Sequence, residues 1–300
     1  MRNCRLAFLF LLISPAAFAL NNRSAVSVNG LDTNPCTPAS PCRSFGAAMA
    51  QTNSGGEIIA LDSAGYGPFT IGQSVTVSGA PGVHAAITVS SGDGISISTG
   101  SPAIVIIRNL VLIGAGGAVG IHQLGAPQLR VIGCLIRGFD PAGIQSDPSA
   151  GAITIHRTSV LDNPGTGILI NGQNLATITD CTIEGSQTGV EANDDSKVVV
   201  AHSTIAGNYT GAFADSENGG LSVPALLVLE ACTIAHNTIA VAAGANLNNN
   251  TAVVYLSQNV IAFSFLGMYA YGAGTAYSFV NNRFEGNDTD GGPFTTIAFK

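Results

Sequence analysis

The segment LATITDCTIE (175–184) is followed by KVVVAHSTIA (197–206), and the two share one pattern. Two apolar residues are separated by one other residue. A small residue lies three positions after the second apolar residue, and a further apolar residue lies two positions after the small one. Alternation with a period of two is typical of β-strands. One such unit cannot bury its apolar side chains alone, so its repetition predicts a solenoid whose stacked coils share a core.

Eight segments follow this pattern, and the small residue, which we call the anchor, recurs every 22 to 29 residues. In the first segment we assign Ile104 and Ile106 as the inward pair, and in the last Tyr277 and Phe279. The anchors are small and mostly polar, which suits identical inward positions at a bend where side chains stack. They are Asn109, Cys134, Thr158, Cys181, Ser203, Cys232, Asn259 and Asn282.

Glycine–apolar pairs, such as Gly189-Val190, follow most anchors by eight to eleven residues, with turn residues in between. Each repeat therefore holds two or three short strands separated by turns. No repeat has a ten-residue helical period, which disfavours leucine-rich and ankyrin-type solenoids. The pattern predicts an all-β parallel β-helix of about ten coils, with the anchors in one interior column.

The two ends of the repeat region are less regular. We expect a short helix over residues 41–51 that caps the first coil, and a closing segment from Thr295 to Phe299. Further strands are expected at 57–61, 69–71, 75–77, 87–89 and 95–97. The chain then divides into a leader (1–19) and one domain (20–300), made of an N-terminal cap (20–57), coils (58–285) and a C-terminal cap (286–300).

The composition is apolar and weakly charged. Charged residues are 10% of the chain against a typical value of about 25%. The formal net charge is −7, with 11 Lys and Arg, which argues against binding to nucleic acid through phosphates.

The first residues have the features of a signal peptide. Arg2 and Arg5 precede the apolar run 6–13, and Ala17-Phe18-Ala19 supplies a small-x-small cleavage site. An N-terminal membrane anchor is the alternative, but the run is too short to span a bilayer. We expect a secreted or periplasmic protein without a membrane span after cleavage.

The cysteines form two groups. Cys36 and Cys42 lie in a proline-rich loop and are predicted to form a disulfide, with a metal site as the weaker alternative. Cys134, Cys181 and Cys232 are anchors on coils that are never adjacent, too far apart for disulfides. We expect three buried, reduced thiols there; a catalytic cysteine is the less favoured interpretation.

The N-terminal residues resemble a known family. The run 26–32, followed by Pro35-Cys36, Pro41-Cys42-Arg43 and Ala47-Ala48, resembles the cap of bacterial right-handed parallel β-helix repeat proteins of the pectate-lyase-like superfamily. The resemblance implies a right-handed β-helix. It leaves function open, because the superfamily includes polysaccharide lyases, glycoside hydrolases, esterases, adhesins and proteins of unknown activity.

Lyases of this superfamily use Ca²⁺ held by carboxylates with an Arg or Lys base, and hydrolases use Asp residues with a nearby His and Arg. The residues directly before the anchors include Arg157, Asp180 and His202, which would be neighbours about 4.8 Å apart on the outer surface. His156 and Glu230 lie one residue earlier in their coils. We take the triplet as the candidate catalytic group. The alternative is a surface ladder of stacked charges.

Two further sites are candidates. Asp194 and Asp195 could hold Ca²⁺ with Glu191, although a calcium site wants six or more oxygens and a solvated turn is the alternative. Tyr269 and Tyr271 flank Ala270 and could form a sugar-stacking pair, or pack at the C-terminal end. His84, His122 and His236 have no evident partners in the sequence.

These observations favour an exported β-helix that binds an extracellular or envelope polysaccharide without catalysis. The alternative is a polysaccharide lyase or glycoside hydrolase that uses Arg157, Asp180 and His202. An adhesin or passenger module is less favoured, since the sequence encodes no translocating barrel.

Overall fold

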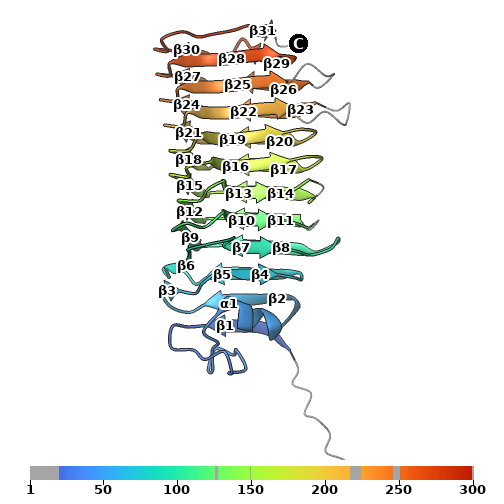
Figure 1. The fold of residues 1–300 in the computed structure, drawn as a ribbon, viewed down its shortest axis with the longest axis vertical. Coiled ribbons are helices and arrows are strands. Elements are labelled where there is room, and N and C mark those ends of the chain that lie inside the picture. Colours follow the sequence, from blue (N-terminus) through green and yellow to red (C-terminus); the bar gives the residue numbers. More distant parts are fainter. Residues whose placement is uncertain (1–19, 126–127, 149, 217–223, 246–250, 299–300) are drawn as a thin grey trace, which may run out of the picture.

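The computed structural model describes residues 20–298 except 126–127, 149, 217–223 and 246–250. The predicted signal peptide (1–19) therefore lies outside the described residues. The rest of the chain forms an elongated stack of coils with its N-terminal and C-terminal coils at opposite ends (Figure 1). Over the described residues, nine successive coils each place a strand in three parallel sheets. The parallel β-helix predicted from the sequence is confirmed.

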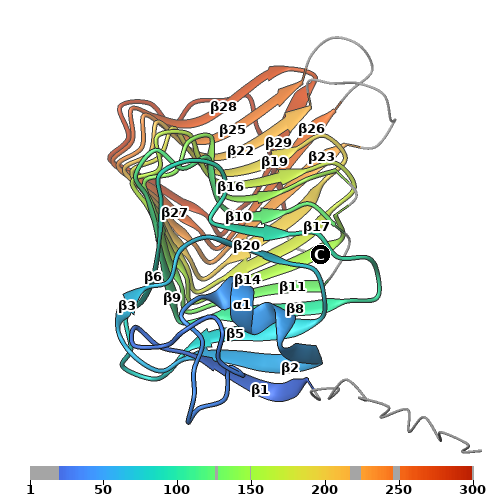
Figure 2. The same ribbon diagram turned by 60° about the horizontal axis from the view of Figure 1, so that its bottom comes forward.

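Figure 2 shows the stack obliquely from its N-terminal end, with the three sheets on different sides of the coils. Sheet 1, in spatial order, consists of β1 (Asn21–Val26), β2 (Thr52–Ala60), β5 (Val75–Gly79), β8 (Ile104–Arg108), β11 (Gln128–Ile132), β14 (Ala152–His156), β17 (Leu175–Thr179), β20 (Lys197–Ala201), β23 (Ala225–Glu230), β26 (Ala252–Ser257), β29 (Gly274–Phe279) and β31 (Thr295–Ile297).

Sheet 2 follows sheet 1 in every coil and has shorter strands. It consists of β3 (Ala64–Gly65), β6 (Ala85–Val89), β9 (Leu110–Gly114), β12 (Leu135–Arg137), β15 (Ser159–Leu161), β18 (Thr182–Glu184), β21 (Thr204–Ala206), β24 (Thr233–Ala235), β27 (Val260–Ala262) and β30 (Arg283–Glu285).

Sheet 3 completes each coil. It consists of β4 (Phe69–Ile71), β7 (Ile95–Ile97), β10 (Val119–Gln123), β13 (Ala142–Ser146), β16 (Thr166–Asn171), β19 (Thr188–Asn193), β22 (Thr210–Ser216), β25 (Ile239–Ala245) and β28 (Leu266–Gly272). The strands expected upstream of the repeats and the closing strand at the C-terminal end are present; Phe299 lies outside the described residues.

The core is a set of apolar columns that run along the stack. Ile155, Ile178 and Val200 are register partners on β14, β17 and β20, and all three side chains are fully buried. At about 25 cal/mol per Å² of buried apolar surface, such columns supply most of the stability of the stack. The helix α1 (Phe45–Ala50) adds Phe45 and Ala48 to the core at the N-terminal end. Ser44 begins this helix, because its hydroxyl accepts a hydrogen bond from the backbone N–H of Ala47.

The anchors form the predicted interior column between sheets 1 and 2. Cys134, Thr158 and Cys181 are 3%, 1% and 3% exposed. The backbone N–H of Cys134 donates to the hydroxyl of Thr158, and that of Cys181 to the hydroxyl of Ser203, so each anchor bonds to the next coil. Amides continue the column at the C-terminal end, where the side chain of Asn259 accepts from the N–H of Cys232.

Two assignments at the ends of the repeat are wrong by one residue. In β8 the inward residues are Val105 and Ile107, whereas Ile104 is 44% exposed. Leu110, and not Asn109, is therefore the residue of this coil in the interior column, and Asn109 lies one position before it. Four consecutive apolar residues (104–107) hide the alternation, because either set of alternate positions could face inward.

The last coil shows the same type of error. In β29 the inward residues are Ala276 and Ser278, which pair with Val254 and Leu256, rather than Tyr277 and Phe279. The anchor Asn282 is correctly placed, because its side chain accepts from the N–H of Asn259. One extra residue between β29 and Asn282 shifted the alternation of the strand.

The glycines of the glycine–apolar pairs form a second column, at the start of the sheet 3 strands. A Cβ added at Gly143, Gly167 or Gly189 would lie 2.5 to 2.7 Å from a carbonyl oxygen of the next coil. Such a contact is far inside van der Waals distance, so the stacking of sheet 3 requires a residue without a side chain at this position.

Candidate carbohydrate-binding face

The outward side chains of sheet 3 form two rows along the stack, which we call the sheet 3 face. Parallel pairing places equivalent residues of successive coils side by side, about 4.8 Å apart. The first row is Ser96, His122, Gln145, Leu169, Glu191, Phe213, Ala242 and Tyr269. The second row includes Asn171, Asn193, Asp215, Gly244 and Tyr271.

Aromatic rings gather at the C-terminal end of the sheet 3 face. The ring centroids of Tyr269 and Tyr271 are 5.5 Å apart, and those of Phe213 and Tyr271 are 6.4 Å apart. Tyr269 is 42% exposed and Tyr271 is 38% exposed. The expectation that these two tyrosines share a surface agrees with this geometry, and Phe213 is a neighbour that the sequence did not indicate.

A glycine allows the ring of Tyr271 to lie against the sheet. A Cβ added at Gly244, the register partner of Tyr271, would be 2.1 Å from the Cζ atom of the ring. The ring therefore occupies the space that a side chain at Gly244 would need, and this brings it toward Phe213 on β22. Rings held in this way offer apolar surface to the C–H face of a sugar.

Polar groups occupy the middle of the same face. The hydroxyl of Thr166 donates to Oε2 of Glu191 at 3.1 Å, and the amide of Asn193 donates to Oδ1 of Asn171 at 3.3 Å. Carboxylate and amide groups next to aromatic rings are the combination that sugar hydroxyls require, since each hydroxyl both donates and accepts.

A histidine that is hydrogen-bonded to two carboxylates lies toward the N-terminal end of the face. Nδ1 of His122 is 2.7 Å from Oδ2 of Asp93, and Nε2 is 3.0 Å from Oδ1 of Asp147. Gln145 also donates to Oδ1 of Asp147, at 2.8 Å. Burial alone would lower the pKa of His122, but the hydrogen bonds and charges of Asp147 and Asp93 outweigh it and raise the pKa above 6.5.

The prediction from the sequence that His122 has no evident partner is wrong. Asp147 follows His122 by 25 residues and Asp93 precedes it by 29, close to the repeat length. That spacing was available in the sequence. It was missed because both aspartates lie in turns next to the sheet 3 strands, outside the pattern used to align the repeats.

The predicted catalytic triplet lies at another place, the corner between sheets 1 and 2. Arg157, Asp180 and His202 have positive φ angles of 48°, 54° and 50°. The N–H of Arg157 bonds to Thr179, next to Asp180, and the N–H of Asp180 bonds to Ala201, next to His202. The three residues are thus stacked on successive coils, as expected. We call this column, which continues with Gly133 and Ala231, the outer corner column.

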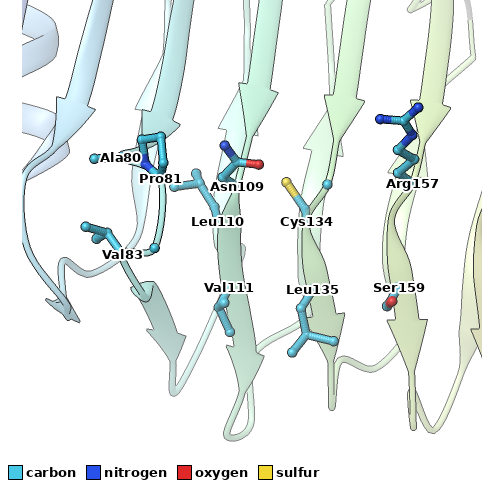
Figure 3. Close-up of a pocket in the computed structure, with 12 residues that line it drawn as sticks. Ala80, Pro81, Val83, Asn109, Leu110, Val111, Cys134, Leu135, Arg157 and Ser159 are labelled. Atoms are coloured by element: carbon cyan, nitrogen blue, oxygen red, sulfur yellow. The ribbon is translucent and has the colours of Figure 1, made fainter.

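The outer corner column has little of what an active site requires. All three side chains are exposed, and Oδ2 of Asp180 is 3.3 Å from Nδ1 of His156 on the preceding coil. Arg157 lies instead at one end of an open groove of about 490 Å³ that also contains Asn109 and Cys134 (Figure 3). Asp180 and His202 do not line this groove. The catalytic role of the triplet remains a prediction.

The proposed calcium ligands are not gathered into a site. Glu191 is on the sheet 3 face, whereas Asp194 and Asp195 are in the turn after β19, and Asp195 is 8% exposed. Within the described part of the chain, no group of three or more His, Cys, Asp or Glu is arranged to hold a metal ion. These carboxylates therefore do not fit a Ca²⁺ ion.

The cysteines behave as predicted. Cys36 and Cys42 form a disulfide with a Cα–Cα distance of 4.6 Å. Cys134, Cys181 and Cys232 are free and buried. Burial raises the pKa of the Cys134 and Cys181 thiols to about 11, which makes them poor nucleophiles near neutral pH. A disulfide is consistent with export, because disulfides persist in oxidising compartments.

Comparison with protein families matches residues 119–284 to the right handed beta helix region. The chain belongs to the right-handed β-helix family. No curated protein matches the chain. In the described ranges, no helix is long and apolar enough to cross a membrane.

Solved structures with similar folds have low sequence identity to the chain. The pectate lyase Pel9A superposes with a TM-score of 0.62 at 15% identity, over 92% of this chain and 80% of the lyase. The enzymatically active domain of bacteriophage CBA120 tailspike protein 2 has a TM-score of 0.56 at 11% identity, over 91% of this chain and 46% of that domain. XylC in complex with xylose superposes with a TM-score of 0.53 at 9% identity, over 87% of this chain and 75% of XylC. These likenesses establish the fold.

Proposed function

We propose that this right-handed β-helix protein is exported and binds an extracellular or envelope polysaccharide along the sheet 3 face without cleaving it. The observation that carries the proposal is the group of Phe213, Tyr269 and Tyr271, with two exposed tyrosines 5.5 Å apart on a flat parallel sheet. Exposed aromatic rings beside Glu191 and Asn193 provide both stacking surface and hydrogen-bonding groups for a sugar chain.

Other observations support this proposal. A pectate lyase and a protein in complex with xylose are among the similar folds. The disulfide between Cys36 and Cys42 supports export. Binding is favoured over catalysis because both ring nitrogens of His122 are occupied by carboxylates and the outer corner column is exposed to water, which weakens electrostatic catalysis.

Affinity electrophoresis through gels that contain single polysaccharides tests the proposal. We expect at least one polymer to retard the protein, and Tyr269→Ala/Tyr271→Ala to migrate freely in the same gel. Asp180→Ala, which changes an exposed side chain at the outer corner column, is the matched control and should be retarded like the wild type. Retardation that survives the tyrosine substitutions would contradict the assignment of this face.

A polysaccharide lyase or glycoside hydrolase is the second candidate. The observation that favours it is the Asp93–His122–Asp147 cluster, because a histidine with two carboxylates on a ligand-facing surface is a possible acid–base group. Arg157, Asp180 and His202 are the other candidate group, as base and acid. Release of unsaturated or reducing sugars, with and without Ca²⁺, would support this candidate. Loss of product in His122→Ala or Asp180→Ala would identify the group responsible.

A further inference from the structure

Positive charge is distributed unevenly around the coils. Across the described ranges, no strand of sheet 3 and no turn next to sheet 3 contains a lysine or an arginine. Lys197 is the lysine or arginine closest in sequence to a sheet 3 strand, and it begins β20 of sheet 1. The described cations lie on sheets 1 and 2, at their corner and in the N-terminal segment: Arg23, Arg43, Arg108, Arg130, Arg137, Arg157, Lys197 and Arg283.

Carboxylates, in contrast, follow the sheet 3 face along much of its length. Asp93 and Asp147 flank His122, and Glu191 stands in the same row as the aromatic residues. Asp194 lies in the turn at the end of β19. Even with His122 protonated, the Asp93–His122–Asp147 cluster has a net charge of −1. The face therefore presents negative charge beside the rings of Phe213 and Tyr269.

From this distribution we infer that the sheet 3 face takes an uncharged glycan and rejects polyuronates. The inference rests on the proposed function and specifies its substrate class. A neutral sugar chain offers hydroxyl donors to the carboxylate of Glu191 while its C–H face packs on the tyrosines. A chain of uronic acids brings one carboxylate per sugar to a surface without a lysine or arginine to neutralise it.

The lengths involved make this repulsion effective. Coils repeat every ~4.8 Å along the stack. The screening length at physiological ionic strength is ~8 Å. A uronate chain that lies along the face would thus have its carboxylates within one screening length of carboxylates on several coils.

Polymers that share a backbone and differ in charge test the inference. Fully methyl-esterified pectin and polygalacturonate share a backbone, as do hydroxyethyl cellulose and carboxymethyl cellulose. We expect the full-length mature protein to bind the uncharged member of a pair at least about tenfold more tightly at low salt, because each like-charge contact weakens binding several-fold. The measurement is affinity electrophoresis or calorimetry, in EDTA and with added Ca²⁺.

Glu191→Gln removes one carboxylate from the face and should reduce the preference several-fold, mainly through better binding of the charged polymer. Glu230→Gln is the matched control, since it removes the same charge from the exposed end of β23 in sheet 1.

The outcomes separate the two proposals. Tighter binding of the charged member, in EDTA or with Ca²⁺, would overturn the inference and leave polysaccharide binding intact. An equal effect of the two glutamine substitutions would also overturn it. Failure of every polymer, neutral or charged, to bind the wild type would overturn the proposed function itself.

Discussion

The outer corner column and the sheet 3 face arise from the same repeat, but they hold their side chains differently. At the corner, Arg157, Asp180 and His202 lie on residues with positive φ and are exposed. On sheet 3, His122 is bonded at both ring nitrogens and the ring of Tyr271 lies over Gly244. A corner residue points away from the stack, whereas a strand residue stands among neighbours on both sides.

This difference shows that stacking alone does not make a site. Stacking places equivalent residues about 4.8 Å apart at every position of the coil. On the sheet 3 face, two adjacent rows provide aromatic, amide and carboxylate groups that can contact one ligand together. The corner offers a single row, which suits a ladder of solvated charges. The experiments below test this contrast, from the largest expected effect to the smallest.

The two glycine positions should respond very differently to substitution. Gly189→Val, in the sheet 3 column, should lower the free energy of unfolding by about 3 kcal/mol or more, because its Cβ would lie 2.5 Å from the carbonyl oxygen of Gly211. Gly133→Asn, in the outer corner column, should change it by less than about 1 kcal/mol, since asparagine tolerates positive φ. Denaturant unfolding measures both. Equal losses would contradict the contrast.

The next effect concerns ligand binding. Tyr269→Ala/Tyr271→Ala should weaken polysaccharide binding by roughly tenfold to a hundredfold, because central aromatic contacts each contribute more than about 1 kcal/mol. Arg157→Ala at the corner should leave the affinity within about twofold. Calorimetry against the polymer that retards the wild type measures both values. A larger loss of affinity in Arg157→Ala than in the tyrosine variant would assign the binding site to the outer corner column.

The His122 cluster should make stability depend on pH. The pKa of His122 is raised above 6.5, so its contribution is fully present below pH 6.5 and is lost as pH rises through the folded-state pKa. We expect His122→Gln to destabilise the protein at pH 5.5 by about 1–2 kcal/mol, the value of charge-assisted hydrogen bonds, and by less at pH 9. Unfolding across this range measures the difference. His202→Gln is the control at an exposed histidine, and it should change the free energy of unfolding little at either pH.

The smallest effect is expected in the interior column. Cys181→Ser should alter the free energy of unfolding by less than about 1 kcal/mol, because Ser203 already fills the equivalent place on the next coil and the thiol bonds a carbonyl as a hydroxyl would. The three thiols should react with a thiol reagent only after unfolding, as their exposures are 3% or less. Rapid labelling of the folded protein would contradict the buried column.

Much of the fold followed from the sequence because the repeat is regular. The anchors from Cys134 to Asn259 were placed correctly, since one small residue among alternating apolar residues marks the bend in each coil. The same reasoning failed at Ile104–Ile107, where every residue is apolar and alternation does not define a face. Of the candidate site, the sequence indicated that Tyr269 and Tyr271 share a surface, because the two residues are two apart on one strand.

What the sequence determined by itself is the periodic part: parallel coils, an interior column with three buried thiols and the Cys36–Cys42 disulfide. The tertiary structure decided that Asp93 and Asp147 both contact His122, and that Phe213 lies against Tyr271. The physical reason is that periodicity specifies which residues are equivalent, whereas a site consists of contacts between residues that are not equivalent. Those contacts depend on how far each turn and ring extends across the neighbouring coils.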